Sequence, residues 1–548
     1  MSSRLLLIAG TLSLSTSVYA QIAPQPKAGA PLPDLSPAQL DLFNTGRALY
    51  LTPMTPEVGL GPIFNKAGCF SCHANPVGGW GSISVTHFGI SDKGTFHVIA
   101  GEEQSLLQAQ ANSETCREII PPEANYTATR VTNSSMAFGL IEALPDAAIA
   151  ANADPDDLNA DGVSGRVHWV SALEDPSHTL RPGRFGWKAQ VLTVLSFSGD
   201  ATRNEMGVTN YLVPDENAPN GDHVLLAQCD TMPEPEDIPD GQGFAFIDRV
   251  THFQRYLAQP PQTPKSGMAG EAIFNQIGCN QCHIPSWTTR NDPSLETALR
   301  NKTIRPYSDF LLHDMGLLGD GISQGDAQEL EMRTPTLWNL RTRDPMLHNG
   351  SAAGGTFSAR VTTAIQAHGP YGEAATSAAA FDALSPTQKT QLIAFLDSLG
   401  KLEFDSDGNG AIDVTDFNAF RAVYGQSTNP NLASAVFDID QDGDIDFTDF
   451  QSFMLAYEGA NGDCNHNGVP DLQDILLGTS PDVDGDGRPD NCAICSADLN
   501  NDRLVDGTDL GLLLGSWGQS DVPADINQDG DVDGTDLGLL LGSWGACN

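Results

Sequence analysis

Two short stretches decide the expected fold, Cys69-Phe70-Ser71-Cys72-His73 and Cys279-Asn280-Gln281-Cys282-His283. Each has the pattern C-x-x-C-H, in which two thiols lie one helical turn apart and a histidine follows directly. This spacing lets the thiols reach the two vinyl groups of one porphyrin while the imidazole points at the iron. The pattern therefore predicts covalent attachment of a c-type haem at each stretch.

The letters before the two motifs also repeat. Ile63-Phe64-Asn65 and Gly68 precede the first motif at the same offsets at which Ile273-Phe274-Asn275 and Gly278 precede the second. A lone pair of cysteines could instead be a redox dithiol or half of a zinc site, but this longer repeat favours haem. We expect a mainly α fold with two cytochrome c-like haem domains, at residues 38–262 and 263–400.

Composition separates the chain into two parts. Its 548 residues include 70 acidic and 28 basic ones, for a formal net charge of −42. This charge argues against nucleic acid as a partner, because phosphate binding needs a basic face. The hydrophobic content of 40% is enough for packed cores. Residues 401–548 hold 29 acidic and 4 basic residues, and nearly all of the acid is Asp.

The first twenty residues predict export. Arg4 precedes an apolar stretch from Leu5 to Leu14, and Val18-Tyr19-Ala20 suits cleavage after Ala20. The stretch is too short to span a bilayer, and no later segment reaches 18 uninterrupted apolar residues, so we expect no transmembrane segment. An uncleaved anchor is the alternative. We expect a signal peptide at 1–20, a Pro-rich linker at 21–37, and a location in the periplasm or at the cell surface.

Longer stretches carry a resemblance to a known family. They are GRFGWKA at 183–189, NEMGVTN at 204–210, YSDFLLHDMG at 307–316, RTPTLWNL at 333–340 and LHNGS at 347–351. Through them the chain resembles the bacterial di-haem oxidoreductases over about residues 38–400. That family is similar to the di-haem cytochrome c peroxidases and to MauG, a di-haem enzyme that matures a protein-derived quinone cofactor.

The resemblance implies that the C-terminal haem stores electrons and that the N-terminal haem meets peroxide. Haem reactivity depends on whether the sixth iron position is filled or open. For the C-terminal iron, His368 stands where relatives carry a distal Met or Tyr, and Met315 is the alternative. For the N-terminal iron, His87 is the candidate for a displaceable ligand and His97 is its competitor. Each histidine could equally be a structural residue.

Two further residues are candidates for catalysis. Glu205 aligns with the catalytic glutamate of the peroxidases, and a carboxyl group there could carry a proton between the two oxygens of hydrogen peroxide. The sequence departs from the peroxidases at Leu195, where they have glutamine, which leaves room for another oxidation. Trp187 is the candidate electron relay between the haems, although the alignment sets Phe185 there. Glu205 could also be a solvated carboxylate, and Trp187 a core residue.

The stretch Asp154-Pro155-Asp156-Asp157-Leu158-Asn159-Ala160-Asp161-Gly162 places oxygen ligands at alternating positions before a turn glycine. A calcium loop has the same pattern, because a hard cation takes several carboxylate and carbonyl oxygens. Counted from Asp157, however, the twelfth position holds His168 rather than Glu. The stretch is either a calcium site or an Asp-rich turn.

The acidic tail repeats a loop with Asp or Asn at positions 1, 3, 5, 9 and 12, which is the EF-hand arrangement of calcium ligands. The candidate ligands are, loop by loop, Asp405, Asp407, Asn409, Asp413 and Asp416; Asp438, Asp440, Asp442, Asp446 and Asp449; Asp463, Asn465, Asn467, Asp471 and Asp474; Asp498, Asn500, Asp502, Asp506 and Asp509; and Asp525, Asn527, Asp529, Asp533 and Asp536. A shorter variant has Asp482, Asp484, Asp486 and Asp490. Arg503 replaces the usual glycine of one loop, which should strain that turn. Asp506–Gly518 recurs letter for letter as Asp533–Gly545, a repeat of 27 residues.

Aspartate at position 12 and one helix after each loop make residues 401–458 and 494–548 resemble dockerin-type calcium repeats. Residues 459–493 resemble thrombospondin-type calcium repeats. We expect bound calcium ions, because this much Asp would otherwise repel itself, and we expect a surface or a protein as partner of the tail. A merely acidic, disordered tail is the alternative. Disulfides could join Cys116 with Cys229, Cys464 with Cys492 and Cys495 with Cys547.

Three functions stay open. The first is an exported di-haem oxidoreductase that reduces hydrogen peroxide with electrons from a small donor protein. The second is a non-catalytic di-haem electron-transfer protein held at the cell surface by its calcium module. The third is MauG-like oxidation of a protein substrate. Glu205 and the family stretches favour the first, whereas Leu195 and the additional histidines keep the second open.

Overall fold

The computed structural model describes residues 22–102, 104–232, 234, 238–465, 467–490, 492, 496–500, 504–520 and 522–546. The expected signal peptide, Cys495, Asp502, Arg503 and Cys547 lie outside these residues. The chain forms two compact units. The large unit holds Ala23–Glu403 and Thr428–Gln441, and the acidic unit holds Phe404–Ser427 and Asp442–Asn548. Within the described ranges, each helix is too short or too polar to cross a membrane.

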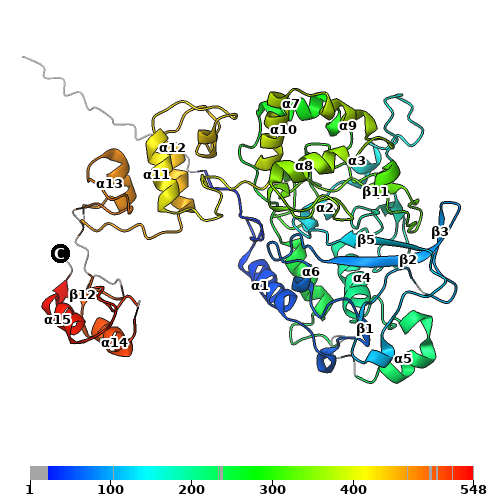
Figure 1. The fold of residues 1–548 in the computed structure, drawn as a ribbon, viewed down its shortest axis with the longest axis horizontal. Helices are drawn as coiled ribbons and strands as arrows, with labels where there is room; N and C mark the ends of the chain where they lie inside the picture. Colours follow the sequence, from blue (N-terminus) through cyan, green and yellow to red (C-terminus); the bar gives the residue numbers. More distant parts are fainter. Residues whose placement is uncertain are drawn as a thin grey trace, which may run out of the picture. The chain divides into compact units, whose positions relative to one another are not determined.

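Helices in the large unit alternate with short strands (Figure 1). The helices are α1 (Pro37–Leu51), α2 (Phe138–Glu142), α3 (Asp146–Ala150), α4 (Val194–Met206), α5 (His223–Cys229), α6 (Phe246–Arg255), α7 (Ala269–Gln276), α8 (Phe357–Gln366), α9 (Ala375–Asp382) and α10 (Pro386–Ser398). The strands are β1 (Ile63–Phe64), β2 (Ser84–Asp92), β3 (Thr95–His97), β4 (Gln110–Ala111), β5 (Tyr126–Val131), β6 (Trp169–Val170), β7 (Arg181–Pro182), β8 (Trp287–Thr288), β9 (Thr303–Ile304), β10 (Leu312–Asp314) and β11 (Glu331–Arg333). Helix makes up 32% and strand 12% of the residues, so the fold is helix-rich with some sheet.

The helix before each C-x-x-C-H motif packs against a helix that follows that motif, and a glycine sets how closely each pair packs. A Cβ atom on Gly46 of α1 would collide with the carbonyl oxygen of Arg249 on α6. In the same way, a Cβ atom on Gly270 of α7 would collide with the carbonyl oxygen of Gln391 on α10. Only glycine permits this approach of two backbones. The two halves of the unit therefore repeat a packing device as well as a motif.

The helix starts follow from the sequence. The Ser36 hydroxyl accepts a hydrogen bond from the backbone N–H of Gln39, whose side chain accepts one from Ser36 N–H. Ser385 and Gln388 form the same capping box at the start of α10. Each box satisfies two backbone donors that a helix start leaves without partners. The helices α1 and α10 thus begin where sequence rules expect them.

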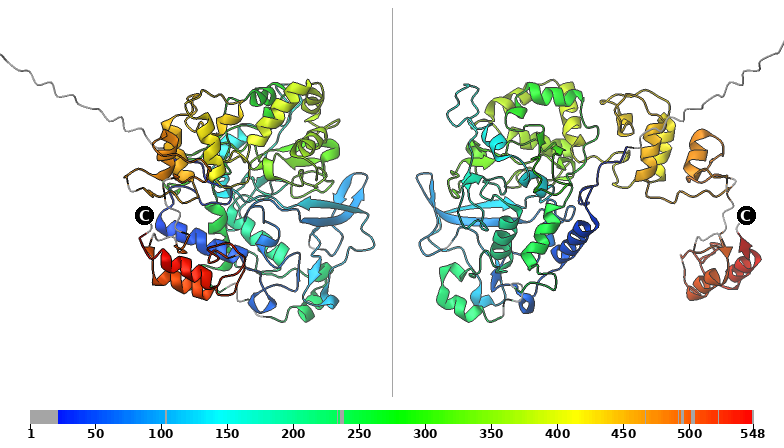
Figure 2. Two further views of the ribbon diagram at one scale, coloured as in Figure 1. Left: turned by 60° about the vertical axis from the view of Figure 1, so that its left-hand side comes forward. Right: turned by 180° about the vertical axis from the view of Figure 1, so that it is seen from behind.

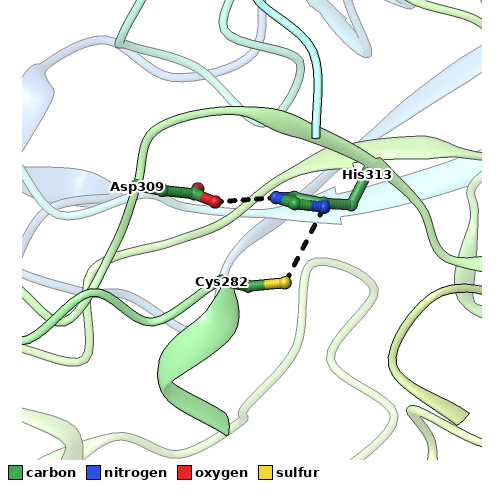
Figure 3. Close-up of side chains that lie close together, drawn as sticks. All are labelled: Cys282, Asp309 and His313. Atoms are coloured by element: carbon green, nitrogen blue, oxygen red, sulfur yellow. Dashed lines mark hydrogen bonds and ion pairs between the residues drawn. The ribbon is translucent and has the colours of Figure 1, made fainter. Parts of the chain in front are cut away.

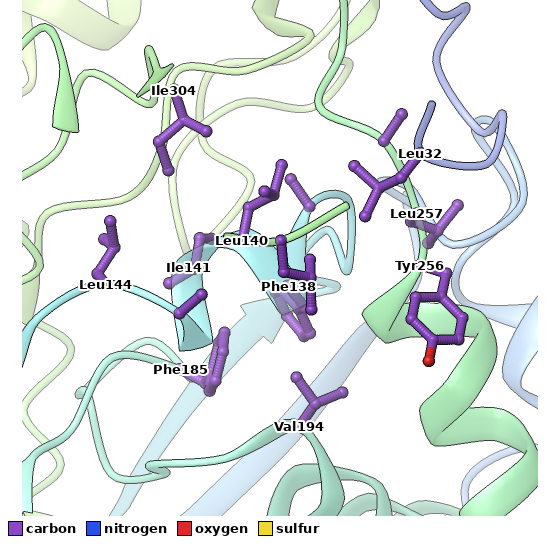
Figure 4. Close-up of a cluster of buried hydrophobic side chains, with 14 of the residues drawn as sticks. Leu32, Phe138, Leu140, Ile141, Leu144, Phe185, Val194, Tyr256, Leu257 and Ile304 are labelled. Carbon is purple, nitrogen blue, oxygen red and sulfur yellow. The ribbon is translucent and has the colours of Figure 1, made fainter. Parts of the chain in front are cut away.

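Apolar side chains of α2, α4 and α6 join those of the connecting loops in one core (Figure 4). The Phe138 and Phe185 rings lie 4.5 Å apart between centroids, and both are buried. A second core forms between α7 and α10 around Phe274 and Phe395, whose centroids lie 5.4 Å apart. Burial of such rings is the main favourable contribution to the stability of each half.

The longest strands form an antiparallel pair. β2 pairs with β5, and His87 of β2 stands opposite Ala128. Successive side chains of a strand alternate between the two faces of the sheet, and His87 is on a buried position of its strand. The pair ends at Val131, which is buried. Figure 1 shows these strands as the long ribbon of the large unit, and Figure 2 shows them from two other sides.

The acidic unit contains α11 (Val414–Val423), α12 (Phe447–Ala456), α13 (Asp471–Leu477), α14 (Gly507–Gly515), α15 (Gly534–Gly542), β12 (Leu504–Val505) and β13 (Gly545–Ala546). The ninth-position aspartates Asp413, Asp446, Asp506 and Asp533 are the N-caps of four of these helices. The structure contains disulfides between Cys116 and Cys229 in the large unit and between Cys464 and Cys492 in the acidic unit.

Candidate functional site

The two C-x-x-C-H motifs adopt the same local conformation. Each begins with a short 3₁₀ turn, at Cys69–Ser71 and at Cys279–Gln281. The backbone N–H of His73 donates to Cys69 O, and that of His283 donates to Cys279 O, both at 2.9 Å. The four cysteines of the motifs are free thiols rather than disulfide partners. The repeated sequence thus gives a repeated turn with both thiols available.

Both motif histidines are oriented in the way an iron ligand requires. Nδ1–H of His73 donates to Gly79 O at 3.2 Å, and Nδ1–H of His283 donates to Tyr307 O at 2.8 Å. Burial lowers the pKa of each histidine to about 4, so the rings are neutral. Nε2 then remains as the nitrogen with a lone pair, and in metal sites a carbonyl group that accepts from Nδ1–H fixes this tautomer.

Each motif lines a large cavity. The N-terminal cavity is lined by Cys69, Cys72, His73, His87 and Glu205, among others. The C-terminal cavity is lined by Cys279, Cys282, His283, Met315 and His368, among others. Both linings are mainly apolar. Free thiols, a neutral imidazole and an apolar volume together suit a porphyrin, so the residues present fit a haem in each cavity.

Glu205 lies in the last turn of α4, on the wall of the N-terminal cavity. Its Oε2 accepts a hydrogen bond from Nδ2–H of Asn65 at 2.8 Å. Burial raises the pKa of Glu205 to about 7, although the Asn65 bond opposes the shift. Asp200, one turn earlier on the same wall, has a pKa raised to about 6 by burial. Glu205 is therefore not a solvated surface carboxylate but a group that changes charge near neutral pH.

Trp187 lines both cavities. Its indole Nε1–H donates to Val131 O at 2.9 Å, which fixes the ring at the end of β5. The ring centroid lies 6.5 Å from that of Trp80 and 6.0 Å from that of His348. Phe185, the competing candidate, instead packs in the hydrophobic core against Phe138. Of these two aromatic residues, only Trp187 stands between the cavities.

The structure places the candidate sixth ligands of the two irons at different sites. His87 lies in the N-terminal cavity, with Nδ1 2.8 Å from the Ser105 hydroxyl, whereas His97 is exposed on β3. His368 follows α8 in the C-terminal cavity, and its Nδ1–H donates to Ala364 O at 2.8 Å. Met315 lines the same cavity and packs against the cluster around Trp187. His87 and His368 therefore keep Nε2 available, and Met315 remains a candidate.

Sequence reasoning missed His313, which lies in the C-terminal cavity beside Cys282 (Figure 3). Its Nε2 is 2.8 Å from Asp309 Oδ2, its Nδ1 is 2.6 Å from Glu373 Oε2, and Cys282 Sγ is 3.7 Å away. Burial would lower the pKa of His313, but the charge of Asp309 raises it well above its usual value. The imidazolium is thus held between two acids. Its only sequence signal was the spacing of Asp309 and His313.

A second buried charge cluster borders the N-terminal cavity. Asp320 accepts a hydrogen bond from Nε–H of Arg130 at 2.7 Å, and Lys188 Nζ lies 2.9 Å from its other oxygen. All three side chains are buried. Burial, followed by the positive charge of Arg130, lowers the pKa of His87 to about 3. His87 is therefore neutral, as a histidine that can reach a metal must be.

The Asp-rich stretch at 154–162 folds as a tight turn. The Asp154 carboxylate accepts from the backbone N–H groups of Leu158 and Asn159, and Asp157 accepts from Asp161 and Gly162. His168 stands at the twelfth position counted from Asp157, where a calcium loop has Glu. His168 is buried and directs Nδ1–H to Lys188 O at 2.7 Å.

In the acidic unit, carboxylates of the loops accept hydrogen bonds from backbone N–H groups. Asp405 accepts from Gly408 N–H and Gly410 N–H, and oxygens of Asp405, Asp407 and Asp416 lie within 4.8 Å of one another. In the last loop, Asp536 accepts from the N–H groups of Ile526 and Asn527. In the first loop the candidate ligands therefore lie close together, and in the last loop the twelfth-position carboxylate closes the turn through backbone hydrogen bonds.

Comparison with known proteins identifies a family. A family model described as "Di-haem oxidoreductase, putative peroxidase" matches residues 92–399, just over half of the chain. The match includes the second motif, Glu205 and His368 but not the first motif. Two solved structures are similar with low TM-scores. A xenon-pressurised hydrazine synthase from Kuenenia stuttgartiensis has 12% identity and a TM-score of 0.30, and the match covers 73% of this chain and 100% of that chain. A MauG-like protein associated with microbial copper homeostasis has 14% identity and a TM-score of 0.30, and the match covers 71% of this chain and 95% of that chain. The comparison with curated proteins gives no match.

Proposed function

The chain belongs to the di-haem oxidoreductase family, and we propose that it is an exported enzyme that reduces hydrogen peroxide with electrons from a small donor protein. The observation that carries this proposal is the asymmetry of the two cavities. Both contain a C-x-x-C-H motif and both border Trp187, but the carboxyl groups on their walls differ. Burial raises the pKa of Glu205 in the N-terminal cavity to about 7, whereas in the C-terminal cavity burial is outweighed by the hydrogen bond from His313, which lowers the pKa of Glu373. Peroxide chemistry is therefore assigned to the N-terminal cavity and electron storage to the other.

The chain would hold each haem through two thioethers and one histidine. Cys69 and Cys72 would attach the N-terminal haem and His73 would ligate its iron, with His87 as a displaceable sixth ligand. Cys279, Cys282 and His283 would do the same in the C-terminal cavity, with His368 or Met315 on the other face. When bound, haem supplies the electrons and the site at which the O–O bond breaks.

Glu205 would move the proton. Reduction of hydrogen peroxide to water needs a proton taken from one oxygen and delivered to the other as the bond breaks. A carboxyl group with a pKa of about 7 is ionised in a large share of molecules at neutral pH, so it can accept that proton and return it. Asn65 orients it by donating to Oε2. Trp187 would provide the path for electrons between the cavities.

The remaining parts of the proposal concern location and the acidic unit. The signal sequence supports export to the periplasm or the cell surface. The Asp-rich loops support calcium binding in the acidic unit, since oxygens of Asp405, Asp407 and Asp416 lie within 4.8 Å of one another in the first loop. A dockerin-like tail of this kind would bind a surface or a protein partner.

One observation favours a second candidate, a di-haem electron carrier without catalysis. Each cavity contains, besides the motif histidine, another histidine able to ligate an iron, His87 in one and His368 in the other. If both occupy sixth positions permanently, neither haem is open to peroxide. MauG-like oxidation of a protein substrate would use the same two cavities and differ in the reductant.

An optical spectrum of the half-reduced protein, recorded with and without hydrogen peroxide, tests the proposal. A peroxidase should show a high-spin band that disappears on addition of peroxide, followed by turnover with a reduced donor cytochrome. Two low-spin haems that do not respond to peroxide would favour the carrier. A response to peroxide without turnover of small donors would favour oxidation of a protein substrate.

A further inference from the structure

The guanidinium group of Arg343 is buried away from water, and no anion among the described residues pairs with it. The residue is 4% exposed and lines the C-terminal cavity. Its Nε and one terminal nitrogen, Nη2, are buried and have no acceptor among the described residues. A buried charge without hydrogen bonds is strongly unfavourable. Such a group is expected only where a ligand supplies the missing partner.

Other buried arginines of the large unit each donate to at least one carboxylate or carbonyl group, although Nη2 of Arg130 has no acceptor among the described residues. Arg184 pairs with Asp146 and donates to carbonyl groups, Arg130 pairs with Asp320, and Arg333 donates to Gly186 O at 2.6 Å and Thr334 O at 2.9 Å. Among the described residues, no carboxylate lies within ion-pair distance of Arg343. Burial, with repulsion from Arg333, lowers the pKa of Arg343 to about 9, which still leaves it charged at neutral pH.

The position of the guanidinium group is well defined. Its Cζ lies 3.2 Å from the ring centroid of Trp80 and 5.6 Å from that of Trp187. Stacking on an aromatic face holds the planar group while leaving its in-plane N–H donors free. Because Trp187 borders both cavities, Arg343 stands at the side of the C-terminal cavity that faces the other one.

We propose that Arg343 binds a carboxylate inside the C-terminal cavity through Nε–H and Nη2–H, and that this carboxylate is a propionate of the haem attached there. The inference rests on the proposed function, since it requires a haem in that cavity. The fork of two adjacent guanidinium donors matches the two oxygens of a carboxylate. A porphyrin held by Cys279 and Cys282 brings its own carboxylates into an apolar space, where a buried cation is the partner they need.

The arginine would then perform two tasks. It would fix the propionate edge of the haem beside Trp80 and Trp187, on the side toward the N-terminal cavity. It would also raise the reduction potential of this haem, because a nearby positive charge favours the form with one more electron. A free organic acid entering the cavity would satisfy the same donors, and the test separates these two sources of a carboxylate.

The test uses the full chain loaded with haem and an optical redox titration of both haems without peroxide. Arg343→Met removes the charge and the donors at similar size. We expect it to lower the midpoint potential of the C-terminal haem by about tenfold in the reduction equilibrium, which is about 59 mV for one electron, and to leave the other haem unchanged. Arg341→Met is the matched control, since Arg341 lies in the same turn near Asp397 and outside the cavity lining. It should shift neither potential.

A second variant and an acetate titration complete the test. If Arg343→Met does not load haem, Arg343→Gln, which keeps a donor but not the charge, should give the same downward shift. An acetate titration of the wild type should leave the spectrum and potentials unchanged, because the propionate already occupies the arginine. A saturable response of the wild type to acetate would overturn the propionate assignment in favour of a free acid. Unchanged potentials in the arginine variants would overturn the proposal itself. Neither result depends on peroxide turnover, so failure of the peroxidase proposal is a separate finding.

Discussion

Oε2 of Glu205 lies 2.8 Å from Nδ2 of Asn65, across 140 positions of sequence. The contact is reinforced by the backbone, since the N–H groups of Asn65 and Lys66 donate to the carbonyl oxygen of Glu205 at 2.7 and 3.1 Å. Asn65 belongs to the letters that repeat before both C-x-x-C-H motifs. The repeat therefore places the carboxyl group on the wall of the N-terminal cavity, close to the cysteines that would hold the haem.

The first prediction concerns Glu205→Gln. Glutamine keeps the size of the side chain but cannot accept the proton of hydrogen peroxide, so turnover with a reduced donor should fall by about 10²–10⁴-fold. Haem content and spin state should stay as in the wild type. Asp200→Asn, in the same helix and cavity, is the matched control and should cost far less. A loss below about tenfold would identify Glu205 as a structural carboxylate and favour the carrier.

The second prediction is a pH dependence. Burial raises the pKa of Glu205 to about 7, and the base must be ionised to accept a proton, so kcat/KM should fall as the pH is lowered through about 7. Asn65 stabilises the ionised form and so holds the pKa down. In Asn65→Ala the inflection should move to higher pH. A pH–rate profile of the two proteins measures this, and an unmoved inflection would mean that another group titrates.

The third prediction concerns His368→Ala. If His368 fills the sixth position of the C-terminal iron, its removal should convert one low-spin haem to high-spin and change that haem's potential. Both haems should remain attached through the cysteines. Met315→Ala serves as the comparison. An unchanged spectrum for His368→Ala together with a changed one for Met315→Ala would move the ligand assignment to Met315.

The fourth prediction concerns attachment. Thioether bonds survive denaturation, so acid acetone should leave the porphyrin on the wild-type chain. Replacement of Cys69 and Cys72 by alanine should remove about half of the bound haem, because only one of two sites is lost. The matched replacement of Cys279 and Cys282 should remove the other half. Complete extraction of haem from the wild type would contradict covalent attachment.

The fifth prediction concerns calcium. Asp529 stands at position 5 of the last loop, where the side chain is the ligand, whereas Asp531 stands at position 7, which ligates through its backbone carbonyl; both side chains are exposed. Asp529→Ala should weaken calcium binding to this loop on the order of tenfold or more, while Asp531→Ala should leave it nearly unchanged. Isothermal titration of the full chain measures both. Chelation should destabilise the acidic unit without altering the haem spectrum, and equal effects of the two variants would indicate general charge rather than coordination.

Much of the architecture followed from local sequence. The C-x-x-C-H letters specify a turn that is closed by a backbone hydrogen bond between residues four positions apart, and the structure has that turn twice. Aspartate at the ninth and twelfth loop positions specifies a helix start, because one caps the helix and the other accepts the N–H of the cap. Interactions within a few residues depend on the sequence alone, which is why these elements were predictable.

The sequence by itself determined the two haem motifs, the family, the acidic loops and the helices that follow them. Only the tertiary structure decided which distant side chains meet. It places Trp187 rather than Phe185 between the cavities, puts His97 on the surface, holds His313 between Asp309 and Glu373, and leaves Arg343 buried beside Trp80. These outcomes depend on long-range packing, in which burial removes water from a charged group and makes its nearest partner decisive. Apart from the spacing of Asp309 and His313, no spacing along the chain encodes these partners.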